Sequence, residues 1–235
     1  NVYANQRHLA VGLCVILLLI FFFLPHVRRM FLHLGRLEGT REKLKSLFVS
    51  RHAWLSRKND PLRPVAVGVI AIALGIVTPY FHGSALIYAL LLLFVFALFS
   101  ENRLMYLLVA IAAACSSFFQ THLFSGGAQN IIRMSFEPGF VLFQPDMLSV
   151  GYYLLQVIGL ALILAIALLF AQKRAYKTVF LAALFVPILF AFTIKLTPDI
   201  TSNHKFIQFS VALLCIFIAL FIAFLFNPFN RSVQK

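Results

Sequence analysis

A short polar cluster stands against a long apolar run near the C-terminal end of the sequence. Residues 196–214 read LTPDITSNHKFIQFSVALL and include Asp199, Asn203, His204 and Lys205. A lysine ammonium is a compact charge that suits a phosphate, and an asparagine amide can orient a sugar hydroxyl or a carboxylate. The same residues also suit a helix cap with an ion pair between Asp199 and Lys205. The residues therefore fit either a binding site or a helix cap.

Other polar residues occur in segments that separate apolar runs. His82 lies in TPYFHG, and Gln120 ends an apolar run at the start of segment 120–148. Arg133 and Glu137 lie within this segment, where the arginine is suited either to a phosphate or to an ion pair with Glu137. These residues are candidates for substrate binding, although a histidine at a hairpin tip needs no function.

Several kinds of catalytic and metal site are not indicated. The chain contains no HExxH, CxxC or GxSxG motif, and its three cysteines all fall in apolar runs, where we expect small core residues. No cofactor motif is present, and the sequence does not decide whether a divalent metal takes part. The aromatic and proline residues of FEPGF and FQPD predict a short re-entrant or interfacial helix.

The composition indicates the elements that position these residues. Hydrophobic residues make up 62% of the chain and charged residues 11%, whereas soluble domains have roughly 25% charged residues. We predict an all-α, polytopic transmembrane bundle of about seven spans. The apolar segments are 9–25, 64–81, 84–99, 104–119, 149–171, 177–194 and 206–226. Gly83, following Pro79, predicts a tight hairpin between the second and third segments.

The distribution of positive charge predicts the orientation. With seven alternating spans, 16 of the 20 lysines and arginines fall on one side, ten of them in segment 26–63. Because cytoplasmic loops are enriched in these residues, 26–63 is predicted to be cytoplasmic, and the N-terminus and segment 120–148 extracytoplasmic. We expect a helix within 30–58 to lie on the inner membrane surface and to contact anionic headgroups. The net charge of +13 therefore reflects the basic segments on the predicted cytoplasmic side. No motif predicts nucleic-acid binding.

Four short sequences together resemble the C-terminal part of bacterial multispanning glycosyltransferases of the GT-C fold and related uncharacterised membrane proteins. They are PYFHG, ENRLMYLLVAIAAACSSFFQ, the outer EPGF, and a TPDITSNHK loop that opens a helix. Members of this group often carry Trp-Asp-Asn-x-Lys in that loop. This chain has Asn203 and Lys205, with Ser202 in place of the aspartate and Thr201 in place of the tryptophan.

The resemblance implies transfer of a sugar from a polyprenyl-phosphate donor on the extracytoplasmic side of the bacterial cytoplasmic membrane. Positive groups would neutralise the departing polyprenyl phosphate, and a carboxylate in the first outer loop of the full protein would act as base. Because the chain begins at Asn1 and has no carboxylate before Glu38, we expect residues 1–235 to be one bundle forming the C-terminal part of a longer protein. The alternative is a non-catalytic protein, such as a transporter or lipid-handling scaffold. Against transport, no predicted span centre is charged and no internal repeat is evident.

Overall fold

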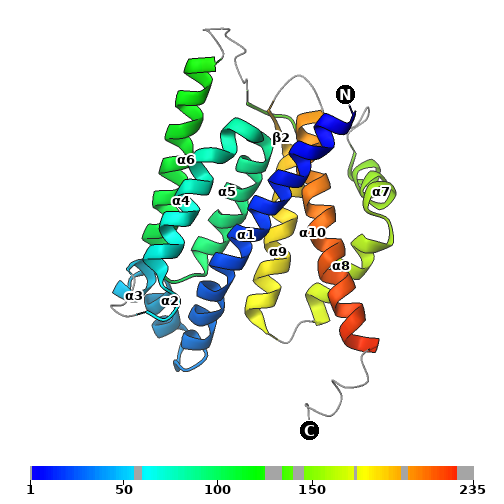
Figure 1. The fold of residues 1–235 in the computed structure, drawn as a ribbon. Helices are drawn as coiled ribbons and strands as arrows, with labels where there is room; N and C mark the ends of the chain where they lie inside the picture. The colour runs from blue at the N-terminus through cyan, green and yellow to red at the C-terminus, as the bar shows by residue number, and fades with distance from the viewer. Residues whose placement is uncertain are drawn as a thin grey trace. The chain divides into compact units, whose positions relative to one another are not determined.

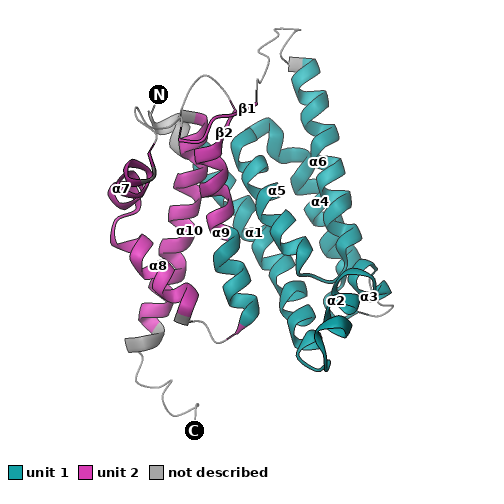
Figure 2. Ribbon diagram, turned by 180° about the vertical axis from the view of Figure 1, so that it is seen from behind, with its two compact units in different colours: residues 1–132, 175–183 teal, residues 133–174, 184–235 magenta. Residues whose placement is uncertain are grey.

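The computed structural model describes residues 2–55, 60–124, 134–139, 146–171, 174–196 and 201–226. It is helical almost throughout (Figure 1), which confirms the all-α class. The chain divides into two compact units, coloured separately in Figure 2. Unit 1 comprises residues 1–132 and 175–183, and unit 2 comprises residues 133–174 and 184–235.

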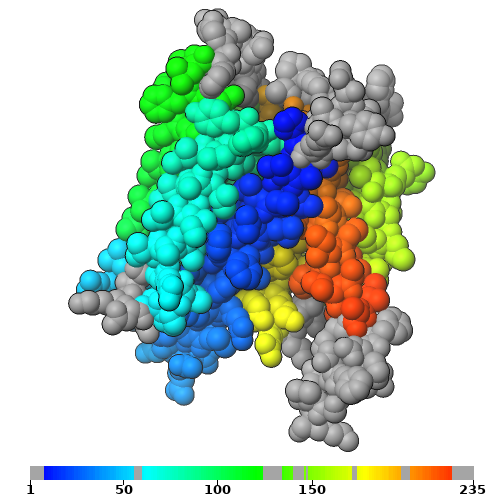
Figure 3. All heavy atoms as spheres, viewed as in Figure 1, coloured from blue at the N-terminus to red at the C-terminus, as the bar shows by residue number. Residues whose placement is uncertain are grey.

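Unit 1 contains six complete helices among its described residues and the first part of a seventh. They are α1 (Val2–Leu34), α2 (Thr40–Phe48), α3 (Arg51–Trp54), α4 (Pro64–Phe81), α5 (Gly83–Leu98), α6 (Arg103–Phe124) and the start of α9 (Ala175–Thr193). Helix α1 packs against α4 and α5, and side chains close the space between them (Figure 3). Phe23, Tyr88 and Phe96 are fully buried in this core.

Unit 2 contains three helices, the rest of α9 and a minimal sheet. Its elements are β1 (Ser135–Phe136), α7 (Met147–Ile158), α8 (Leu160–Ala171), the end of α9, β2 (Ile194–Lys195) and α10 (Thr201–Phe226). The two strands are antiparallel, with Ser135 opposite Lys195 and Phe136 opposite Ile194. Residues 135–139 thus form a strand and a turn, so the helix predicted at FEPGF is wrong over these residues. Of FQPD, only Asp146 lies within the described residues.

Within the described residues, five helices are long and apolar enough to cross a membrane. They cover His8–Leu34, Pro64–Phe81, Arg103–Leu123, Ala175–Thr193 and Ser202–Ala223. The third predicted span corresponds to the shorter α5, and the fifth to α7 and α8, which meet at an angle of 101°. The bend occurs at Gly159, whose φ of 61° is a conformation that other residues rarely adopt. The chain is therefore a helical membrane protein.

Several boundaries differ from those predicted. Helix α1 continues to Leu34 through residues assigned to the loop 26–63, because Phe23, Val27 and Met30 continue its buried face at helical spacing. Met30 also packs with Leu47 of α2 and Ala53 of α3, so the basic segment folds back onto α1. Helix α6 extends to residue 124, past the predicted end at residue 119, and α10 begins at residue 201, before the predicted start at residue 206.

The hairpin predicted between the second and third apolar segments is confirmed. Helix α4 begins with Pro64, where a missing amide proton costs no helical hydrogen bond, and ends at Phe81. His82 has extended backbone and caps α5, because its Nδ1 accepts a hydrogen bond from the Ala85 amide at 3.2 Å. Although it lies between the two helices of the hairpin, His82 is only 7% exposed.

Helices α4 and α6 pack closely and run parallel. Gly68 faces Met105, Gly75 faces Val109 and Ala113, and the Ser116 hydroxyl donates to the Ile76 carbonyl at 2.6 Å. Small residues allow helices within a membrane to approach closely. A Cβ on Gly75 would lie 3.4 Å from the Val109 carbonyl oxygen, so a methyl group fits and a larger side chain does not.

We predict that Gly75→Leu lowers the free energy of unfolding by about 1–3 kcal/mol, because the added side chain must separate α4 from α6. Gly75→Ala should change it little. Val77→Leu, on the exposed face of the same helix, is the matched control. Thermal unfolding of the purified protein in detergent measures all three. Equal stability of the two leucine variants would contradict the packing described here.

Candidate functional site

Two segments of the predicted outer site are joined in unit 2. The β1–β2 pairing places Glu137, which follows β1, beside Lys195 of β2. The Lys195 Nζ donates to Glu137 Oε2 at 3.1 Å, and the Ser135 hydroxyl donates to Glu137 Oε1 at 2.7 Å. Hydrogen bonds from Ser135 and then from Lys195 hold the pKa of the Glu137 carboxyl below its usual value. Glu137 is thus exposed and ionised, and it forms an ion pair with Lys195.

Asn203 joins α10 to the end of α9. Its side-chain amide donates to the Ala191 carbonyl at 3.0 Å and to the Ile194 carbonyl at 2.7 Å, and the residue is fully buried. Carbonyls at a helix C-terminus have no partner within the helix, so this amide supplies one. Asn203 therefore acts as a positioning residue in this structure, and its amide protons are not free to orient a sugar.

His204 and Lys205 follow on the first turns of α10 and are partly exposed. His204 Nε2 lies 2.9 Å from the Tyr153 hydroxyl of α7, and the two rings stack. Lys205 makes no hydrogen bond or ion pair with another described residue. The ion pair proposed between Lys205 and Asp199 falls outside the described residues, because Asp199 is not among them.

The remaining candidates lie elsewhere or outside the description. His82 and Gln120 belong to unit 1, at the ends of α4 and α6. Because these helices run parallel, both residues lie at the same end of that unit. Arg133 is not among the described residues, so its predicted pairing with Glu137 is not seen.

Two carboxylates from segments that the sequence predicts to be outer are described, Glu137 and Asp146, and both accept hydrogen bonds. Asp146 caps α7, where its Oδ1 accepts a hydrogen bond from the Ser149 amide at 2.8 Å. The hydrogen bonds from Ser149 lower the pKa of Asp146, as Ser135 and Lys195 lower that of Glu137. A carboxylate with a lowered pKa is a weaker base than an ordinary one. Both carboxylates are therefore stabilised in their ionised form.

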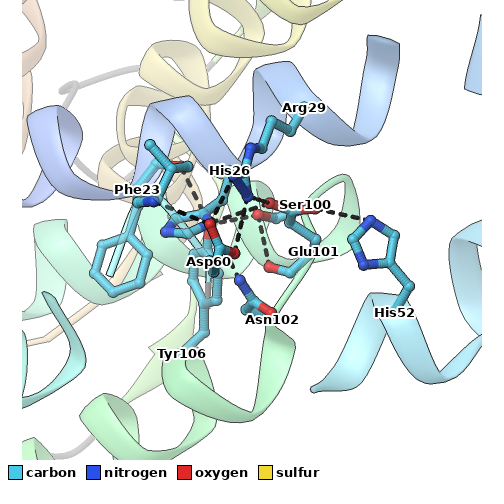
Figure 4. A network of polar contacts seen from close by, with 10 residues as sticks. Phe23, His26, Arg29, His52, Asp60, Ser100, Glu101, Asn102 and Tyr106 are labelled. Atoms are coloured by element: carbon cyan, nitrogen blue, oxygen red, sulfur yellow. Dashed lines mark hydrogen bonds and ion pairs between the residues drawn. The ribbon is translucent and has the colours of Figure 1, made fainter. Parts of the chain in front are cut away.

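A buried ionic cluster in unit 1 was not anticipated from the sequence. Figure 4 shows Arg29 and His26 of α1 and His52 of α3 converging on Glu101, which precedes α6 and is 1% exposed. Arg29 Nη1 lies 2.9 Å from Glu101 Oε1, and His52 Nε2 lies 2.9 Å from Oε2. Arg29 also donates two hydrogen bonds to the carboxylate of Asp60, at 2.6 and 2.9 Å.

The backbone around Glu101 is held by several further contacts. Asn102 adopts φ 60°, a conformation that asparagine tolerates better than most residues. The Tyr106 hydroxyl donates to the Ser100 hydroxyl at 2.7 Å, and the Arg103 guanidinium donates to the Ala97 and Leu98 carbonyls that end α5. These bonds fix the α5–α6 connection, so the carboxylate cannot easily turn away from its cations.

The protonation of His26 decides between two of its contacts. Its Nδ1 lies 3.3 Å from Glu101 Oε1 and 3.2 Å from the Asn102 amide nitrogen. A protonated Nδ1 donates to the carboxylate, whereas an unprotonated Nδ1 accepts from the amide. The sequence signal for the cluster was an isolated acidic residue, Glu101, directly after an apolar run.

No metal site is formed by the described side chains. Among them, no three His, Cys, Asp or Glu residues are placed to share an ion. Cys14, Cys115 and Cys215 are free and exposed at the protein surface, so the prediction that they are small core residues is wrong. Their apolar helices supply the explanation, because a membrane helix also exposes small apolar residues to lipid.

Comparisons of the chain with protein-family models, with curated proteins and with solved structures find no match.

We predict that Glu101→Gln lowers the free energy of unfolding by about 1–3 kcal/mol, because the hydrogen bonds from Arg29 and His52 lose their charged acceptor while Arg29 keeps its bonds to Asp60. Glu42→Gln, in the exposed first turn of α2, is the matched control and should change little. Thermal unfolding in detergent compares the two. Similar stability of both variants would show that the buried carboxylate does not hold α1, α3 and the α5–α6 connection together.

Proposed function

We propose that the chain is the C-terminal part of a multi-pass glycosyltransferase of the GT-C type, which moves a sugar from a polyprenyl-phosphate donor on the extracytoplasmic side. The observation that carries the proposal is the β1–β2 pairing. It joins the EPGF segment to the chain that leads into TPDITSNHK, two of the sequences on which the resemblance rests. Glu137 and Lys195 are in direct contact although they lie 58 residues apart.

The proposed topology has seven spans, the N-terminus outside, and the basic segment 26–63 in the cytoplasm of a bacterial cell. Five helices are long and apolar enough to cross a membrane, and the bent α7–α8 pair makes a sixth span if its two helices count as one. The seventh span of the proposed topology is the shorter α5. The basis of the topology is the positive-inside rule applied to the 16 cations on one side. In this topology, the cations of 26–63 contact anionic lipid headgroups, each contributing on the order of 1 kcal/mol.

Lys205 is the residue we propose to bind the donor phosphate. During transfer, an acceptor oxygen forms a bond to the anomeric carbon, and the bond from that carbon to the phosphate oxygen breaks. Negative charge then develops on the departing polyprenyl phosphate, where an ammonium stabilises it. Lys205 suits this role because it is partly exposed and unpaired among the described residues, whereas Lys195 is already paired with Glu137.

The acceptor's proton passes to a carboxylate that we place in the part of the protein preceding this chain. This assignment comes from the resemblance and is supported by the lowered pKa of both described outer carboxylates, Glu137 and Asp146. Asn203 has an indirect role, because it fixes the start of α10 against the end of α9 and so determines where His204 and Lys205 lie.

A non-catalytic role in transport or lipid handling is the second candidate. The observation that favours it is the ionic cluster of unit 1. Helix α1 carries His26 and Arg29 within a candidate span, and buried ionisable residues in spans are typical of transporters. A full-length protein that transfers no sugar from any polyprenyl-phosphate donor would support this second candidate.

We predict that Lys205→Met in the full-length protein reduces sugar transfer by on the order of 10²-fold, because the leaving phosphate loses its counter-charge. Lys205→Arg should retain part of the activity. Lys43→Met, on the exposed face of α2, removes a lysine far along the chain and should leave transfer unchanged. Release of polyprenyl phosphate by membranes with equal amounts of each variant is the measurement. Unchanged transfer by Lys205→Met would contradict this role and would show that Lys205 only forms part of the start of α10.

A further inference from the structure

A groove with a volume of about 430 Å³ lies along one face of α1 in unit 1. Phe21, Pro25, Arg28 and Leu32 of α1 line it, together with Leu62 before α4 and Tyr176 at the start of α9. The four α1 residues recur every three or four positions, so they form a continuous stripe on the helix. At a rise of 1.5 Å per residue, the stripe is about 16 Å long.

The walls of the groove are suited to a hydrocarbon chain. Phe21 is 73% exposed and Leu32 is 56% exposed, yet both lie on a helix apolar enough to cross a membrane. Apolar side chains exposed on a spanning helix are suited to contact with lipid. A narrow apolar stripe of this length matches an extended acyl chain much better than it matches a polar soluble molecule.

The polar residues that line the groove are Arg28 and Arg29 of α1, which lie between Pro25 and Leu32 in the sequence, and Tyr176 of α9. Arg28 is exposed, and its guanidinium makes no hydrogen bond or ion pair with another described residue. The neighbouring Arg29 is different, because Asp60 and Glu101 neutralise it. The Tyr176 hydroxyl is likewise unbonded within the described part of the chain, and it lines the same groove. An arginine fork and a hydroxyl beside an apolar channel are complementary to a phosphate that carries an acyl chain.

We infer that this groove binds one anionic phospholipid, with the phosphate on Arg28 and Tyr176 and an acyl chain along Phe21 and Pro25. The inference rests on the proposed membrane placement of the basic segment, and it replaces general headgroup attraction by a defined site. The lipid comes from the leaflet on the side of segment 26–63. Its negative charge is needed because Arg28 has no carboxylate partner among the described residues, unlike Arg29.

Native mass spectrometry of the full-length protein in detergent tests this inference with two lipids of equal chain length. Phosphatidylglycerol should bind wild-type protein as a single retained adduct, and phosphatidylcholine should bind much more weakly. Arg28→Gln should weaken phosphatidylglycerol binding at least about tenfold, since a charge-assisted hydrogen bond to the phosphate is lost. Tyr176→Phe should weaken it less, and Arg28→Lys should retain part of the binding.

Arg36→Gln is the matched control, because Arg36 is an exposed arginine that follows α1 but does not line the groove. It should bind phosphatidylglycerol as wild-type does. Equal weakening by Arg28→Gln and Arg36→Gln would overturn the inference in favour of diffuse attraction by the basic segment. Equal binding of both lipids would also overturn it. The measurement reports lipid mass and not sugar transfer, so its failure leaves the proposed site at Lys205 unaffected.

Discussion

Burying a polar group in an apolar bundle costs free energy unless the group has a partner, and this cost explains the most specific features of both units. Leaving a charged or hydrogen-bonding group unpaired inside hydrocarbon costs several kcal/mol. Glu101 therefore collects Arg29, His26 and His52 around it. In unit 2, the buried amide of Asn203 is held by two carbonyls at the end of α9. Each polar group thus fixes a relation between helices that apolar packing alone would leave adjustable.

The polar residues of unit 1 form two groups, one at each end of the parallel helices α4 and α6. The ionic cluster lies where α4 and α6 begin, whereas His82 and Gln120 lie where these parallel helices end. The charged groups of the cluster are paired with one another, which suits a structural centre. The candidate site of unit 2 is different, since Lys205 is partly exposed and Glu137 lies at the surface. Compensated charge supports structure, and an uncompensated cation is what a phosphate-binding site needs.

The sequence predicted local features well and long-range pairings poorly. Apolar run length identified the helices, and Pro79 with Gly83 identified the hairpin that begins α5 at His82, because both signals act through neighbouring residues. It did not predict that α1 continues past residue 26, since Val27 and Met30 are buried by contacts with other helices. The β1–β2 pairing and the partners of Glu101 were missed for the same reason. A single sequence shows that a polar residue needs a partner, but not which distant residue supplies it.

The proposed sugar transfer requires that the polar regions of unit 2 face outward and that segment 26–63 face the cytoplasm. Single cysteines at Met134 before β1 and at Lys43 in α2, with Cys14, Cys115 and Cys215 replaced, allow a direct measurement with a membrane-impermeant thiol reagent. In intact cells the reagent should label position 134 and spare position 43, which should react only after the membrane is opened. Labelling of position 43 in intact cells, or protection of position 134, would contradict the outward-facing site and with it the proposed transfer.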